Sequence, residues 1–86
     1  MDDITQAARQ CLKNVEAVLN AGGATLADVV KVTAFLTDMG QFAEANAAYA
    51  EFFDEPFPAR SCIEVAGLPL GVPIEIEAIA VVKEEA

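Results

Sequence analysis

The first third of the chain repeats hydrophobic residues every three or four positions, which is the spacing of one face of an α-helix. This repeat predicts a helix over about residues 3–21. Asp3, with Gln6 three residues later, has the pattern of a capping box, and Gly22 with Gly23 is typical of a helix end. The hydrophobic positions are Ile4, Ala7, Ala8, Cys11, Leu12, Val15, Val18 and Leu19.

The middle of the chain changes from a strand pattern to a second helical one. Residues 29–36 are rich in β-branched and aromatic side chains and predict a strand. Asp38 and Gln41 repeat the capping pattern and predict a helix over about residues 39–53. Asn46 lies on the apolar face of this helix, which is otherwise formed by Phe42, Ala45, Tyr49, Phe52 and Phe53.

Two more strands are predicted in the last third. Prolines at positions 56 and 58 end the second helix, because each lacks the backbone donor that a helix needs. Strands follow over residues 60–65 and 74–82, and a frayed tail is expected at 83–86. Alternation in the last strand separates two faces, one with Ile74, Ile76, Ala78 and Ala80 and the other with Glu75, Glu77, Ile79 and Val81.

The predicted order is helix, strand, helix, strand, strand, which indicates an α+β fold with two helices packed on a mixed β-sheet. The connection between residues 36 and 60 is long enough for a right-handed parallel crossover, and the last two strands are predicted to form an antiparallel hairpin. Residues 1–86 make a single domain. Because 55% of so short a chain is hydrophobic, some apolar surface is expected to face another subunit.

Composition narrows the possible functions. The net charge is −9 and no two basic residues are adjacent, so nucleic acid is not an expected partner. No apolar run approaches the roughly 20 residues of a membrane span, and the N-terminus has no signal-peptide pattern. Two cysteines without CxxC spacing favour reduced thiols in a cytoplasmic protein, with Cys11 buried and unreactive. The absence of histidine removes histidine-based catalysis and most zinc sites.

Arg60 is the main candidate for binding chemistry. A guanidinium at the start of an apolar strand is costly to desolvate unless it meets an anion, which a ligand or a protein carboxylate can supply. The protein candidates are Glu64, Glu75 and Glu77. Asn46 either ties down a neighbouring backbone or lines a wet cleft, and both interpretations stay open. Tyr49 is predicted to be a core residue with its hydroxyl hydrogen-bonded.

Three segments closely resemble the RidA family, also called YjgF or reactive-intermediate deaminases, some of whose members are labelled endoribonuclease L-PSP or translation inhibitor. They are DVVKVTAFLTDM at 28–39, PARSCIEVA at 58–66 and IEIEAIA at 74–80. The resemblance spans nearly the whole chain. It implies a chorismate-mutase-like fold assembled as a homotrimer with pockets between subunits.

The resemblance also implies an activity, the hydrolysis of reactive enamine and imine acids such as 2-aminoacrylate and 2-iminobutanoate to 2-oxo acids and ammonia, without a cofactor. By motif position, Arg60 would grip the substrate carboxylate and Glu75 would position or activate the attacking water. Cys62 would line the pocket and Asn46 would lie close by. Family members begin with an N-terminal β-hairpin that has no counterpart here, so a shortened, partial domain is expected.

Two other functions are carried as alternatives. One is a small-carboxylate-binding protein or fragment that keeps the anion site but does not catalyse. The other is the ribonuclease suggested by the family's older label, which the charge of −9 disfavours.

Overall fold

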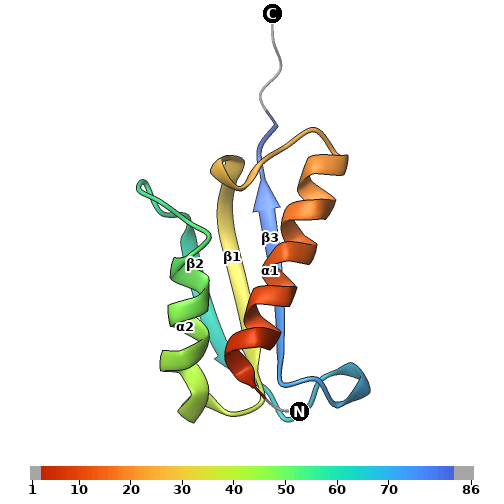
Figure 1. The fold of residues 1–86 in the computed structure, drawn as a ribbon, viewed down its shortest axis with the longest axis vertical. Coiled ribbons are helices and arrows are strands. Elements are labelled where there is room, and N and C mark those ends of the chain that lie inside the picture. The colour runs from red at the N-terminus through yellow and green to blue at the C-terminus, as the bar shows by residue number, and fades with distance from the viewer. Residues whose placement is uncertain (1–2, 83–86) are drawn as a thin grey trace, which may run out of the picture.

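The computed structural model describes residues 3–82, and its helices and strands follow the predicted order (Figure 1). The frayed tail predicted at 83–86 lies outside the described residues. Short 3₁₀ turns occur at Leu26–Asp28, Met39–Gln41 and Pro69–Gly71. The helices and strands are α1 (Ile4–Ala21), β1 (Val29–Leu36), α2 (Phe42–Ala50), β2 (Ala59–Glu64) and β3 (Ile74–Ala80).

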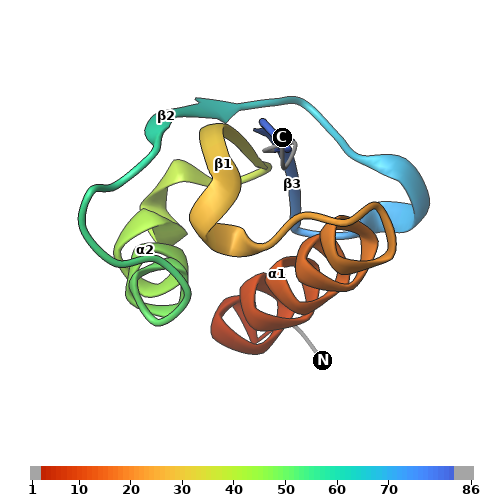
Figure 2. The same cartoon turned by 90° about the horizontal axis from the view of Figure 1, so that it is seen from above.

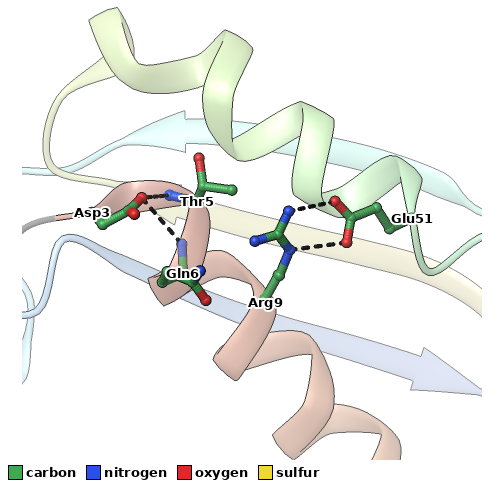
Figure 3. Close-up of polar contacts among 5 residues, drawn as sticks. All are labelled: Asp3, Thr5, Gln6, Arg9 and Glu51. Atoms are coloured by element: carbon green, nitrogen blue, oxygen red, sulfur yellow. Dashed lines mark hydrogen bonds and ion pairs between the residues drawn. The ribbon is translucent and has the colours of Figure 1, made fainter.

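The first helix begins and ends close to its predicted bounds. Oδ1 of Asp3 accepts hydrogen bonds from the backbone N–H groups of Thr5, at 2.9 Å, and Gln6, at 3.3 Å (Figure 3). The predicted N-cap is therefore confirmed, although within residues 3–82 the Gln6 side chain does not return the bond that a full capping box needs. At the other end Gly23 has a φ of 86°, which glycine adopts readily.

The second helix is shorter than predicted. It covers Phe42–Ala50, and Asp38 instead caps the preceding 3₁₀ turn, with its Oδ1 accepting from the Gly40 N–H at 2.8 Å. After Ala50 the chain turns and buries Phe53, which is 5% exposed. The prolines at 56 and 58 favour extended backbone and lead the chain into β2, but they lie too far along the chain to account for a helix that ends at Ala50.

The strand order corrects one topological prediction. β1 lies in the middle of a three-stranded sheet, parallel to β2 and antiparallel to β3, so the predicted hairpin between the last two strands is wrong. β1 is the most apolar strand and gains most from neighbours on both sides, whereas β2 and β3 carry the charged residues expected of edge strands. The predicted parallel crossover between β1 and β2 is confirmed.

Both helices cover the same face of the sheet (Figures 1 and 2). Two clusters of buried side chains fill the space between these layers, and Leu36 and Val32 of β1 are fully buried within them. One cluster is formed by Ile4, Ala8, Leu36, Ala45, Ala48 and Ile74, and the other by Leu12, Val29, Val32 and Phe53.

One contact clamps the two helices together at the surface. Arg9 of α1 donates from Nε to Oε1 of Glu51 at 2.9 Å and from Nη2 to Oε2 at 2.8 Å (Figure 3). Glu51 directly follows α2. The pair is bidentate, which fixes the orientation of both side chains as well as their separation.

The opposite face of the sheet is not covered by any element in the described part of the chain (Figure 2). The alternation predicted for the last strand is confirmed, because Ile74 and Ile76 face the helices while Glu75 and Glu77 are exposed. Ile79 on this open face is 61% exposed. We call this surface, formed by the outward-facing residues of the three strands, the open sheet face.

Candidate functional site

Arg60 projects from the edge strand β2 toward the helix layer. It pairs in register with the buried Val32, and Cys62, two residues along the same strand, packs against the core on the same side. Nη1 of Arg60 donates a hydrogen bond to Oδ1 of Asn46 on α2. Of the two interpretations left open for Asn46, the structure favours the cleft-lining one, because Asn46 lies in the wall of a cavity beside Arg60. Its amide oxygen also holds the side chain of the candidate binding residue.

Two aromatic rings flank the same guanidinium. Cζ of Arg60 lies 5.3 Å from the centroid of the Phe42 ring and 4.7 Å from that of the Tyr49 ring. Both distances are within the range of cation–π attraction. Phe42, Asn46 and Tyr49 are spaced by four and three residues along α2, so they form one stripe of the helix, and Arg60 lies against that stripe.

None of the carboxylates proposed from the sequence pairs with Arg60. Within residues 3–82 Arg60 takes part in no ion pair. Oε1 of Glu64 instead accepts from the backbone N–H of Met39 at 2.7 Å, and Glu75 lies on the open sheet face, opposite Phe35 in the register. A guanidinium without a protein counter-ion retains both its charge and most of its N–H donors for an external anion.

A cavity of about 380 Å³ opens beside Arg60. Among the described residues Arg60 is the only charged one in its wall, and apart from Asn46 the other wall residues are apolar or aromatic. This combination suits a small molecule with one carboxylate and an apolar remainder. The wall consists of Asn46, Tyr49, Ala50, Phe53, Phe57, Pro58 and Arg60.

A smaller cavity of about 20 Å³ lies behind the guanidinium, between α2 and the sheet. Cys62 is part of its wall, together with Asn46, Tyr49 and Arg60. The sequence-predicted residues Arg60, Asn46 and Cys62 are therefore brought together in one place. Glu75 is not, because β1 separates its strand from β2. Glu75 is exposed, and it borders a separate cavity of about 430 Å³ between α1 and β3.

The environment of Tyr49 differs from its prediction. Its ring packs in the core beside Phe53, with ring centroids 4.8 Å apart, but its buried hydroxyl has no hydrogen-bond partner among the described residues. The predicted tether is therefore wrong. Burial raises the pKa of the Tyr49 hydroxyl, and the positive charge of Arg60 opposes that rise.

Sequence reasoning did not assign Phe42, Tyr49 or Phe57 to the site. The spacing of Phe42, Asn46 and Tyr49 on one helical stripe was visible in the sequence. It could have suggested that whatever contacts Asn46 also contacts the two rings. Phe57 carries no comparable signal, since it lies in an irregular segment between prolines.

Comparison with known proteins identifies the family. The family model described as "Endoribonuclease L-PSP" matches residues 1–82. The chain belongs to this family. Among curated relatives, the 2-iminobutanoate/2-iminopropanoate deaminase of Salmonella typhimurium is 53% identical over 83 residues, covering 93% of this chain and 65% of the relative. The deaminase of the same name from Escherichia coli K12 is 54% identical, covering 92% of this chain and 64% of the relative.

Solved structures confirm the predicted RidA-type α+β fold. The yeast protein Mmf1 has a TM-score of 0.92 at 46% identity, covering 96% of this chain and 66% of that protein. TdcF of E. coli, solved with bound serine, has a TM-score of 0.89 at 46% identity, covering 94% of this chain and 66% of TdcF. The chain thus spans slightly less than two thirds of the length of the first curated relatives that it matches.

Proposed function

We propose that the chain hydrolyses small reactive 2-imino and enamine acids, such as 2-iminobutanoate and 2-aminoacrylate, to 2-oxo acids and ammonia. The observation that carries this proposal is Arg60, which has no acidic partner in the described residues and lies at the wall of a small, mostly apolar cavity. Two relatives more than 50% identical to the chain bear the name 2-iminobutanoate/2-iminopropanoate deaminase. Both free cysteines fit a cytoplasmic location for this activity.

In this proposal Arg60 binds the carboxylate that all these substrates share. One of its N–H groups is engaged by the neutral oxygen of Asn46, so a pair of parallel hydrogen bonds to a carboxylate remains available from the others. Cys62 lies behind the guanidinium and shapes the floor of the site. The apolar wall near Phe57 would contact the short side chain of the substrate.

Glu75 supplies the acid–base function in this proposal, from a second copy of the chain. Within one protomer Glu75 is on the opposite face of the sheet from Arg60, so the two groups can share one substrate only across an interface. The open sheet face has the character of such an interface, because Ile63 and Ile79 there are 45% and 61% exposed. We propose the homotrimer that the family resemblance implies as the active assembly.

The chemistry needs no metal and no redox step. Glu75 takes a proton from water as the water oxygen bonds to C2 of the imine, and it passes this proton to the imine nitrogen. In the resulting carbinolamine Glu75 takes the hydroxyl proton and delivers it to the amine nitrogen as the C–N bond breaks, which releases ammonia and leaves a 2-oxo acid. An enamine enters the same sequence after a proton is added to its C3. Since the imine carbon is already electrophilic, one positioned carboxylate and a fixed substrate are sufficient catalytic elements.

The first test is the release of 2-oxo acid from freshly generated 2-iminobutanoate by the purified chain. We expect acceleration over buffer by the wild type and its loss in Arg60→Ala. Arg9→Ala is the matched control, because Arg9 is bound to Glu51 on the helix surface and does not line the cavity. A wild type that is no faster than buffer would refute the proposal.

A second test asks whether the site is shared between copies. Arg60→Ala and Glu75→Gln chains are unfolded, mixed and refolded together. Glu77→Gln, assayed by itself, is the matched control that shows whether the loss of activity is specific to Glu75. Random mixing should restore both groups at about a quarter of the interface sites. No recovery would contradict a shared site, because a site within one chain lacks one group in every molecule of the mixture.

A non-catalytic carboxylate-binding protein remains the second candidate. Arg60 and Asn46 belong to a single protomer, so anion binding needs only one copy, whereas the proposed catalysis needs two. Binding of 2-oxobutanoate by a chain that does not turn over imines would favour this function. For the ribonuclease alternative, absence of any RNA shift in a gel at low salt would agree with the charge of −9, and salt-sensitive binding would oppose it.

A further inference from the structure

The two arginines that the structure describes are held in opposite ways. Arg9 donates hydrogen bonds from Nε and Nη2 to the two carboxylate oxygens of Glu51, which is the arrangement of a structural ion pair. Arg60 has no such acid among residues 3–82 and is bounded by a neutral oxygen and two aromatic rings. Both arginines lie at the surface of one small domain, so the different surroundings of Arg60 point to an effect of the rings that a carboxylate would not have.

A carboxylate beside Arg60 would occupy its N–H donors and neutralise its charge, and would therefore compete with an anionic ligand. An aromatic ring attracts the cation through the negative potential of its face and uses no N–H donor. The ring of Tyr49 is the nearer of the two, at 4.7 Å from Cζ, and it is fixed in turn by packing against Phe53. A ring so fixed restricts where the guanidinium can lie.

We propose that Tyr49 is a positioning residue, whose ring holds the Arg60 guanidinium in place for a carboxylate ligand without neutralising it. The inference rests on the proposed function, in which Arg60 binds the substrate carboxylate. The ring and not the hydroxyl performs this role, because the hydroxyl is buried and has no partner among residues 3–82. Phe42, at 5.3 Å, bounds the guanidinium as a second ring.

The position of Arg60 is tested by NMR without any ligand. Arg60 side-chain proton signals should be displaced by the ring current of Tyr49 and should show nuclear Overhauser contacts with the Tyr49 ring in the wild type. Tyr49→Leu should remove the Tyr49 contribution and Tyr49→Phe should restore it. Phe52→Leu is the matched control, because it removes a ring that packs in the same cluster but forms no cation–π contact.

The functional consequence is tested by titrating 2-oxobutanoate as the probe. We expect the dissociation constant to rise about three- to tenfold in Tyr49→Leu, as for loss of one partly exposed cation–π contact, and to return to within about twofold of wild type in Tyr49→Phe. In turnover, Tyr49→Leu should raise KM more than it lowers kcat, because uniform binding of the carboxylate is lost.

The outcomes separate the inference from the proposed function. A wild type that does not bind 2-oxobutanoate would remove support for the proposed function, while the ring-current displacement would still decide whether Tyr49 holds Arg60. Absence of wild-type Overhauser contacts between the two residues would overturn the inference even if Tyr49→Leu failed to fold. Equal losses of affinity in Tyr49→Phe and Tyr49→Leu would also overturn it, since the hydroxyl would then be the active group.

Discussion

Replacing Asn46 by aspartate tests whether Arg60 is an anion site with its charge intact. Oδ1 of Asn46 accepts a hydrogen bond from Nη1 of Arg60, so Asn46→Asp places a carboxylate where a neutral amide oxygen now lies, with almost no change in shape. The new ion pair would hold Arg60 at least as firmly as the amide does. The affinity for a carboxylate ligand should nevertheless fall, because the ligand would meet a neutralised site.

The magnitude follows from the geometry of a guanidinium. A ligand carboxylate on the remaining N–H groups of Arg60 would lie about 6 Å from the new carboxylate, across the planar fork. Two like charges at about 6 Å repel by about 0.7 kcal/mol in bulk water and about 2.8 kcal/mol at an effective dielectric constant of about 20. Arg60 is exposed, so an intermediate value of about 1.4 kcal/mol is appropriate, and it corresponds to a roughly tenfold rise in Kd.

The assay is a calorimetric titration of 2-oxobutanoate at two salt concentrations. The loss in Asn46→Asp should shrink at about 1 M salt, where the Debye length falls to about 3 Å. Asn46→Ala is the control that removes the hydrogen bond without adding a charge, and its loss should be smaller and insensitive to salt. If Asn46→Asp bound the ligand as tightly as Asn46→Ala at both concentrations, Arg60 would not be the anion site.

Three further predictions concern stability and thiol chemistry. Hydrogen bonding to Arg9 lowers the pKa of Glu51, so the ionised Glu51 stabilises the fold fully above its unfolded-state pKa, and this stabilisation is lost as pH falls through its folded-state pKa. The melting temperatures of wild type and Glu51→Gln should therefore differ near pH 7 and converge in acid. A difference that stays constant with pH would contradict the charge effect. Leu36 is fully buried, so Leu36→Ala should cost about 2–5 kcal/mol and lower Tm by roughly 10–30 °C in circular dichroism melts. Val18→Ala, at a side chain 73% exposed, should leave Tm nearly unchanged, and equal shifts in the two variants would refute the assignment of the core. Burial raises the pKa of Cys11, so peptide-resolved alkylation should be slow near pH 8 and accelerate at higher pH; rapid labelling near pH 8 would show that the thiol is accessible and ionised.

The elements of the fold could be predicted from local pattern because each one has its own periodicity. The amphipathic repeat and Asp3 defined α1 almost to the residue, and alternation assigned the two faces of β3. The strand order could not be obtained in this way. Residues 65–73 contain the glycines and prolines of a hairpin turn, but the segment crosses over β1 instead, and only the partners available to each strand decide between these paths.

For the candidate site, too, the sequence predicts the individual residues but not the contacts between them. Arg60 could be selected from sequence because a charge at the start of an apolar strand needs an anion from the protein or from a ligand, and Asn46 because an amide interrupts an apolar face. Their hydrogen bond depends on how α2 packs on β2, which local pattern does not contain. Tyr49 was predicted to be a core residue, and its ring does pack in the core, but the same packing also places the ring face against Arg60. Tyr49 therefore both packs in the core and contacts the candidate binding residue.

The positions of Arg60 and Glu75 link assembly to function in the proposed enzyme. Arg60 is directed to the helix-covered side of the sheet, whereas Glu75 lies on the open sheet face among exposed isoleucines. Covering those isoleucines with a second copy would remove apolar surface from water. In the proposed assembly the same contact brings a carboxylate to a guanidinium that pairs with none in the described part of its own chain. A small domain in which 55% of the residues are hydrophobic has a thermodynamic reason to associate. In the proposed assembly that association also completes the site, so a free protomer would bind carboxylates but would lack the acid–base group needed to hydrolyse an imine.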